Sequence, residues 1–168
     1  GMSRGLGDVY KRQGLDAEEA EEGDFSWFQG MKLALFDVSD ESSPSILDEL
    51  IIGSRGTTSN ALYDHHAFTM DSDGNLALPV SLYTGGEGAN DYGDFEYYGV
   101  HLYNLSSDGG IELEKEIEMD DASYIKRTLI LSDDNERYMY VLDYSHLFLV
   151  ELEGDYDVIA EEELSEDG

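Results

Sequence analysis

The feature that most constrains this chain is the alternation of short apolar runs with turn-forming residues. Between residues 31 and 163 the apolar runs are separated by Gly, Asp, Asn and Ser, and no stretch keeps a helical period. Short apolar runs with this punctuation are typical of β-strands. The pattern predicts strands at residues 31–38, 46–52, 62–70, 76–83, 95–105, 111–119, 124–131, 138–143, 146–152 and 158–163.

A weak internal repeat relates these predicted strands to one another. An apolar-polar-apolar-polar pattern that closes a strand begins at Phe36, at Tyr103 and at Val150. Repeats of about 40–50 residues with four strands each are typical of β-propellers, and the loop at residues 84–94 accounts for the longer first interval. A β-sandwich of about ten strands is the alternative, and the repeat argues against it. We therefore predict an all-β fold, a partial β-propeller of two to three four-stranded antiparallel blades.

The two ends of the chain are predicted to lie outside this domain. Residues Ser3 to Gln13 resemble a translated sequencing adapter, whose transposon end encodes the run from Asp8 to Gln13. We therefore exclude residues 1–13 from the fold and expect the chain to be a fragment of a longer protein. Residues 14–24 are densely acidic and are predicted to be disordered, with a short helix as the alternative. The propeller domain is predicted at residues 25–164, and residues 165–168 form an acidic tail.

The charge of the chain excludes several classes of partner. Its formal net charge is −30, with only 9 Lys and Arg. A chain without a basic patch has nothing to release counterions from phosphate or to bind anionic lipid, so we expect neither nucleic acid nor direct membrane insertion. Such self-repulsion is tolerated in concentrated salt, which favours a halophilic source. A disordered acidic protein is the alternative, but 40% hydrophobic and 11% aromatic residues can build a core.

The absence of cysteine excludes disulfides, zinc–thiolate sites and a catalytic thiol. No Gly-x-Ser-x-Gly elbow is present either, and the glycine-rich stretch that begins at Thr84 lacks the lysine of a phosphate-binding loop. Asp143, Ser145 and His146 hold the residue types of a hydrolytic triad, but four consecutive positions rarely give the triad geometry. We predict a turn between two strands there.

Several blocks of sequence resemble a known family. They are residues 30–40, 52–57, 61–68 and 92–95, of which Ala61-Leu62-Tyr63-Asp64-His65 is the most specific. These blocks are similar to predicted secreted proteins with a C-terminal β-propeller domain, which is itself distantly similar to WD-repeat propellers. The resemblance runs from about Asp24 to about Glu153. It implies a propeller fold and a secreted or cell-surface location, and it implies no particular activity.

Asp64 and His66 are the first candidate binding residues. On a strand, neighbouring side chains point to opposite faces, so Asp64 and His66 share a face whereas His65 and His66 do not converge on one metal ion. In similar folds this strand lines the central channel. One hypothesis is a ligand or metal site there, and the other is a polar network that positions the strand. We assign no metal and no cofactor.

A second group of candidates surrounds the loop at residues 84–94. In a propeller this loop links the second and third strands of its blade, on the same face as the blade connections at residues 53–60 and 120–123. Tyrosines give amphipathic contact area on such a face. The candidate residues for binding here are Tyr92, Asp94, Tyr97 and Tyr98.

Two functions remain open from the sequence. The first is a non-catalytic binding or structural module of an exported protein, with an unknown protein or glycan as its ligand. The alternative is a metal-dependent hydrolase whose site lies at the propeller channel, because propellers host enzymes as well. We favour binding over catalysis. An incomplete ring leaves sheet edges open, so we also expect self-association through exposed blade edges.

Overall fold

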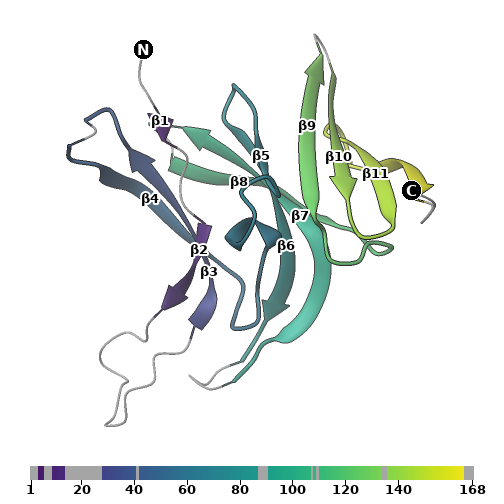
Figure 1. Cartoon of the computed structure of the whole chain (residues 1–168), viewed down its shortest axis with the longest axis horizontal. Coiled ribbons are helices and arrows are strands. Elements are labelled where there is room, and N and C mark those ends of the chain that lie inside the picture. Colours follow the sequence, from purple (N-terminus) through teal and green to yellow (C-terminus); the bar gives the residue numbers. More distant parts are fainter. Residues whose placement is uncertain are drawn as a thin grey trace. The chain divides into compact units, whose positions relative to one another are not determined.

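The fold consists of antiparallel sheets without an α-helix in the residues that the structure describes. The computed structural model describes residues 4–5, 9–13, 28–40, 42–86, 91–106, 108, 110–133 and 136–164. Its strands form three four-stranded sheets, two of which join consecutive strands in the order β5-β6-β7-β8 and β9-β10-β11-β12 (Figure 1). Four consecutive antiparallel strands in one sheet are the unit of a β-propeller blade. The prediction of an all-β partial propeller is therefore confirmed.

The first sheet is centred on β3 (Phe28–Asp37), which pairs with β4 (Ser45–Ile52). Two short strands, β1 (Arg4–Gly5) and β2 (Val9–Gln13), also pair with β3. Both lie in the segment of residues 1–13 that the sequence analysis excluded from the fold, and their backbones are part of this sheet. The acidic segment 14–24 and the tail 165–168 lie outside the described residues.

The second sheet contains β5 (Thr69–Met70), β6 (Asn75–Thr84), β7 (Asp94–Ser106) and β8 (Gly110–Glu118). In Figure 1 the long strand β7 is visibly curved. The Asp71–Asn75 segment makes the tight turn between β5 and β6, where Gly74 has a φ of 90° and the Asp71 carboxylate accepts the backbone N–H groups of Asp73 and Asn75. Asp, Gly and Asn are the residues that tolerate the positive φ and the local side-chain bonds of such a turn.

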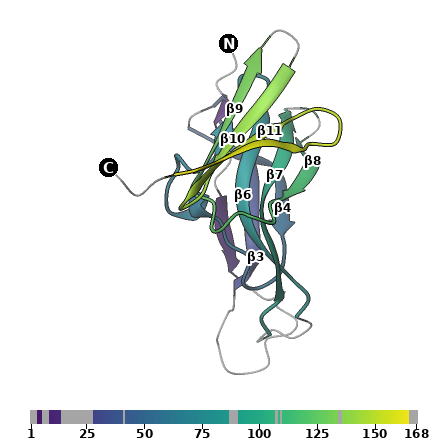
Figure 2. The ribbon, with the colours of Figure 1, turned by 90° about the vertical axis from the view of Figure 1, so that its right-hand side faces the viewer.

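The third sheet contains β9 (Arg127–Asp133), β10 (Glu136–Leu142), β11 (His146–Glu151) and β12 (Val158–Glu163). Its first three strands lie side by side in Figure 2 and pair in continuous antiparallel register. The outer strand β12 pairs with β11 and is exposed along its whole length.

One strand prediction is wrong. Residues 62–70 were expected to form a strand, but the structure has a 3-10 helix, η1 (Asn60–Leu62), then a series of turns, and only Thr69 and Met70 pair with β6. The Ser59 hydroxyl caps η1, and the Asp64 carboxylate accepts the N–H of His66. Such local side-chain bonds compete with a sheet ladder. Pro79, which lies opposite the continuation of β5, offers no N–H to extend the pairing.

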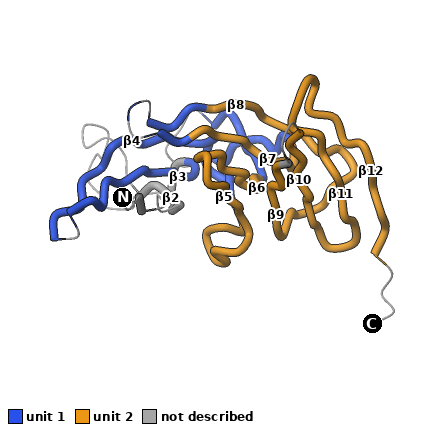
Figure 3. Tube along the Cα trace, turned by 90° about the horizontal axis from the view of Figure 1, so that it is seen from above, with its two compact units in different colours: residues 1–58, 81–96, 105–112 blue, residues 59–80, 97–104, 113–168 orange. Residues whose placement is uncertain are grey.

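The chain divides into two compact units, coloured in Figure 3. Unit 1 comprises residues 1–58, 81–96 and 105–112, and unit 2 comprises residues 59–80, 97–104 and 113–168. Unit 2 holds a buried hydrophobic cluster to which strands of both the second and the third sheet contribute, among them Val100 and Leu102 of β7 and Met139 and Val141 of β10. Apolar burial of this kind is the main term that stabilises a blade pair.

Candidate functional site

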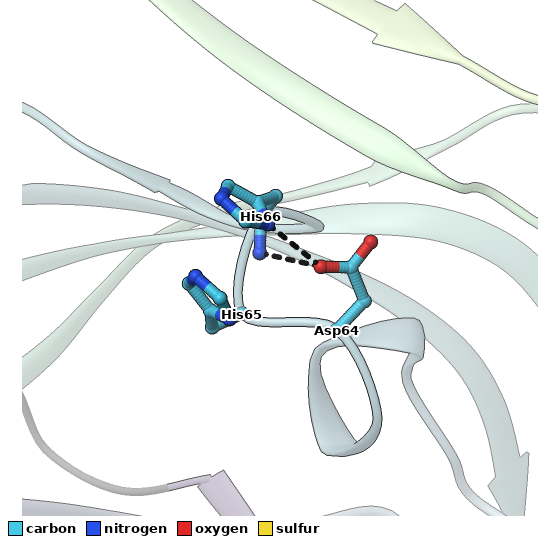
Figure 4. Close-up of side chains that lie close together, drawn as sticks. All are labelled: Asp64, His65 and His66. Carbon is cyan, nitrogen blue, oxygen red and sulfur yellow. Dashed lines mark hydrogen bonds and ion pairs between the residues drawn. The ribbon is translucent and has the colours of Figure 1, made fainter.

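Asp64, His65 and His66 lie together in a turn of unit 2, between η1 and β5. Ala67 N–H donates to the Asp64 carbonyl over 3.0 Å, which closes the turn. The Asp64 Oδ1 atom accepts the backbone N–H of His66 over 2.9 Å and lies 3.1 Å from its Nδ1 (Figure 4). These contacts, the backbone bond first, hold the pKa of the Asp64 carboxyl below its usual value. The structure thus brings Asp64 and His66 together.

The expectation that His65 and His66 point away from each other is wrong. It assumed a strand, on which His65 and His66 would point to opposite faces, but both lie in the turn. Their ring centroids are 3.8 Å apart at an angle of 40°. Asp64, His65 and His66 each offer one ligand atom, and these three atoms lie within 4.8 Å of one another.

Four tyrosines, here called the tyrosine cluster, lie near one another in unit 2. The cluster consists of Tyr63, Tyr98, Tyr124 and Tyr144. Burial raises the pKa of Tyr124, and the neighbouring phenols of Tyr63, Tyr144 and Tyr98 raise it further. Tyr63 and Tyr144 are strongly exposed, at 74% and 65%. Among the described large hydrophobic residues only Tyr92 is comparably exposed, so these rings are presented to solvent rather than packed.

A buried carboxylate fixes the segments that carry this cluster. Asp143 is 1% exposed and follows the last residue of β10, directly before Tyr144. Its Oδ2 accepts the N–H and the hydroxyl of Ser123 over 2.7 and 2.8 Å, and its Oδ1 accepts the N–H groups of Ser145 and His146 over 2.7 and 2.6 Å. Burial alone would raise the pKa of Asp143, but these four bonds outweigh it and lower the pKa to about 2. The ionised carboxylate therefore ties the connection before β9 to the turn before β11.

Further hydrogen bonds join the same connection to η1 and to β10. The Asn60 side-chain amide donates to the Lys126 carbonyl over 3.1 Å, and Lys126 N–H donates to the Leu142 carbonyl over 2.8 Å. The Lys126 ammonium lies 3.8 Å from the centroid of the Tyr144 ring, within the range of a cation–π contact. Three of the cluster's tyrosines thus stand on segments that are bonded to one another.

In unit 1 an analogous pair joins the connection after β4 to the loop after β6. Arg55 lies over the Tyr92 ring with 4.2 Å between the guanidinium carbon and the ring centroid, and the Arg55 carbonyl accepts Gly93 N–H over 2.8 Å. Asp94, the next candidate residue, is exposed at the start of β7. The loop does link β6 to β7 as predicted, although its residues 87–90 lie outside the described part of the chain.

Tyr97 and Tyr98 belong to unit 2, and they have different surroundings. Tyr98 is a member of the tyrosine cluster. The Tyr97 hydroxyl instead lies 2.9 Å from Nε2 of His101, whose Nδ1 lies 3.0 Å from the Tyr103 hydroxyl. His101 and Tyr103 are each 1% exposed. Tyr97 therefore belongs to a polar network that ends in the core.

Asp143, Ser145 and His146 form the predicted turn and lack the geometry of a triad. The Ser145 hydroxyl and the Asp143 carboxylate both lie on the Nδ1 side of the imidazole, at 3.1 and 3.7 Å. A Ser-His-Asp triad needs its serine and its carboxylate on opposite ring nitrogens.

Sequence reasoning missed Tyr63, Tyr124 and Tyr144 as members of one cluster. Each stands in a connection outside the strands, where a large aromatic residue has no core to fill. That position was the signal available in the sequence, since large aromatics in loops that share one face indicate binding.

The searches of curated proteins and of solved structures return no significant match. In the described residues there is no helix of the length and apolarity that a membrane span requires. The family profile described as "Beta propeller domain" matches residues 10–153. This match covers most of the chain and agrees with its two consecutive four-stranded sheets, and we conclude that the chain belongs to the Beta propeller domain family.

Proposed function

We propose that this domain is a non-catalytic binding module and that its ligand is a neutral glycan held by the tyrosine cluster. The observation that carries the proposal is the exposure of Tyr63 and Tyr144 beside the half-buried Tyr124. Stable folds rarely leave several aromatic rings exposed together without a use for them. A tyrosine supplies an apolar ring face for the C–H groups of a sugar and a hydroxyl for its polar groups.

The fixed positions of these rings support binding further. Asp143 and Asn60 bond the three segments that present Tyr63, Tyr124 and Tyr144. Rings held by such a frame lose little freedom when a ligand stacks on them, so more of the contact energy remains as affinity.

The charge of the protein favours a neutral ligand over a cationic protein. At a net charge of −30 a cationic partner would be attracted over a long range at low ionic strength. In about 1 M salt the Debye length falls to about 3 Å, which removes this attraction but leaves stacking on tyrosine intact. We propose that the module belongs to an exported protein of a salt-rich habitat, supported by this charge and by the resemblance to secreted propeller proteins. Sequencing of the flanking genomic region is expected to show an export signal in the same reading frame.

The binding proposal is tested with soluble neutral polysaccharides, such as xylan, mannan and dextran, by affinity electrophoresis and calorimetry in 2 M NaCl. We expect at least one polysaccharide to bind, and we expect Y63A/Y144A to weaken that binding at least tenfold because each stacked ring contributes about 1 kcal/mol. The matched control is Tyr138→Ala, a tyrosine at the opposite end of β10. Tyr92→Ala tests in the same assay whether the Arg55–Tyr92 pair of unit 1 contributes.

Two results would overturn the proposal. One is that none of the polysaccharides binds, and the other is that Y138A loses as much affinity as Y63A/Y144A. Binding of a lysine-rich protein that disappears as salt is raised would replace the glycan by a cationic protein as the ligand.

A further inference from the structure

The turn of Asp64, His65 and His66 offers an unusual density of metal-binding groups for so acidic a chain. Three consecutive residues present two imidazoles and one carboxylate, and their ligand atoms lie within 4.8 Å of one another. Both histidines are exposed. We propose that these three residues bind a divalent first-row transition metal ion of the Zn²⁺, Ni²⁺ and Cu²⁺ class. This site is independent of the glycan proposal and uses none of the tyrosine cluster.

The backbone of the turn is held in place from three directions. Asp64 N–H donates to the Asn60 carbonyl over 2.9 Å, and Ala67 N–H donates to the Asp64 carbonyl over 3.0 Å. Ala67 itself is fully buried, and its carbonyl accepts the N–H and the hydroxyl of Thr128 over 3.0 and 3.3 Å. Because these hydrogen bonds fix the backbone of the turn, binding needs only rotations of the side chains, which cost little.

The contact between Asp64 and His66 already has the spacing of two ligands in one coordination shell. Metal–nitrogen and metal–oxygen bonds of about 2.0–2.2 Å place two neighbouring ligand atoms about 3 Å apart. Asp64 Oδ1 and His66 Nδ1 are 3.1 Å apart, within hydrogen-bonding distance of each other (Figure 4). A metal ion binds Nδ1 through its lone pair, so the neutral imidazole then carries its single ring proton on Nε2.

His65 supplies the third ligand from the neighbouring ring. Its centroid lies 3.8 Å from that of His66, and a modest rotation brings one of its nitrogens toward the same ion. Two imidazoles and one carboxylate select zinc, nickel and copper, whereas calcium and magnesium prefer all-oxygen sites. Three ligands on an exposed turn leave the other coordination positions to water.

Arg127 allows a test in which a substitution should strengthen metal binding rather than weaken it. One of its guanidinium nitrogens lies 3.8 Å from Asp64 Oδ2, so its positive charge opposes a cation at the carboxylate. Because both side chains are partly exposed, the effect is modest. Removal of this charge by Arg127→Gln should therefore strengthen metal binding about two- to fivefold, while any variant of a true ligand weakens it.

The experiment measures binding of Ni²⁺ and of Zn²⁺ to the full chain by calorimetry, without a polyhistidine tag. We expect one ion per chain, a loss of at least tenfold in affinity for H65A and for H66A, and a smaller loss for D64N. His146→Ala is the matched control, because this histidine also has carboxylates within 4 Å but lies elsewhere, at the start of β11. It should change the affinity less than twofold.

The proposal is overturned if neither ion binds at 1 mM, or if H65A and H66A bind as the wild type does. It is equally overturned if H146A loses as much affinity as they do, or if R127Q weakens binding. Thermal melts without metal confirm that each variant is folded, and polysaccharide binding, measured separately on H65A and H66A, should be unchanged.

Discussion

At the scale of single residues, His101 shows how burial sets the charge of a side chain. Its imidazole is 1% exposed and lies between the hydroxyls of Tyr97 and Tyr103. Burial lowers the pKa of His101 to about 4, although Glu116 lies 3.9 Å away and would favour the charged form. The imidazole is therefore neutral at pH 7, with one nitrogen donating to a phenol and the other accepting from one.

This burial predicts a loss of stability in mild acid. Above the ordinary histidine pKa of about 6.5 the imidazole is neutral in both folded and unfolded chains, and the folded state has its full stability. As the pH falls from about 6.5 to about 4, the unfolded chain takes up a proton that the folded chain resists. The contribution of His101 to the free energy of unfolding should fall by about 2 kcal/mol between pH 8 and pH 5. Urea denaturation at a series of pH values measures this change.

The control for this prediction is His101→Gln, which keeps one donor and one acceptor but does not titrate. All other ionisable groups are common to the two proteins, so only the difference between their pH profiles is assigned to His101. If the two profiles are parallel between pH 8 and pH 5, the imidazole does not resist protonation in the fold.

The same scale shows why the candidate site was only partly predictable. Asp64 and His66 were expected to share one face of a strand, whereas the structure brings them into contact because the backbone turns between them. The neighbouring His65 was set aside because the segment was read as a strand. The turn depends on hydrogen bonds of Asp64 with the Asn60 carbonyl and of the Ala67 carbonyl with Thr128. A pattern of alternating apolar residues does not reveal either contact.

At the scale of elements, the period of apolar residues located nine of the ten predicted strands to within about three residues. β12 was located at both of its ends, and β6 was recognisable from a nearly continuous apolar run that is buried on both faces. β5 was not, because its length is decided by Pro79 on the neighbouring strand and by Ala67, whose carbonyl bonds to Thr128 instead. Whether a strand forms is encoded in its own residues, whereas its length depends on the strand with which it pairs.

Gly99 in β7 determines how closely that strand approaches its neighbour. A Cβ atom at this position would lie 2.3 Å from the carbonyl oxygen of Ile117 and 2.9 Å from the ring of Tyr97. The obstacle is backbone of the adjacent strand β8, which moves only if the ladder is disturbed. We expect Gly99→Ala to lower the free energy of unfolding by about 2 kcal/mol, measured by urea denaturation.

Gly154→Ala is the comparison, since its added Cβ has no atom within 4 Å and only its φ of 64° opposes the change. We expect the smaller loss there. The double variant Y97A/G99A separates the two obstacles at Gly99, because it removes the ring but leaves the Ile117 carbonyl. Full recovery of the stability lost in G99A, relative to Y97A alone, would show that the ring rather than the strand spacing excludes a side chain.

At the scale of the whole molecule, the acidic charge opposes association between chains, whereas the exposed apolar side chains favour it. The net charge is −30, and the outer strands carry exposed Ile46 and Leu47 in β4 and Val158 and Ile159 in β12. β12 also carries Glu161, Glu162 and Glu163, and charges on an edge strand oppose pairing with another chain. At low ionic strength repulsion within the chain weakens the fold and repulsion between chains keeps the edges apart.

Salt should therefore stabilise this protein. Raising NaCl from about 0.05 to about 1 M shortens the Debye length from about 14 Å to about 3 Å, which screens repulsion between neighbouring carboxylates. We expect the melting temperature to rise by at least about 10 °C over this range, with most of the rise below 0.5 M. Screening saturates in this way, whereas a general salting-out effect grows steadily with concentration and continues above 1 M.

Protein concentration separates the two consequences of screening. A rise in melting temperature that is the same at 5 and 100 µM protein comes from relief of repulsion within one chain. A rise that grows with concentration, together with a larger mass by light scattering, comes from association through exposed edges such as β12, and I159K should abolish that part alone because it adds a charge to an exposed edge position. A melting temperature that does not respond to salt would mean that the carboxylates are too far apart in the fold to repel, and it would remove the physical basis for a salt-rich habitat.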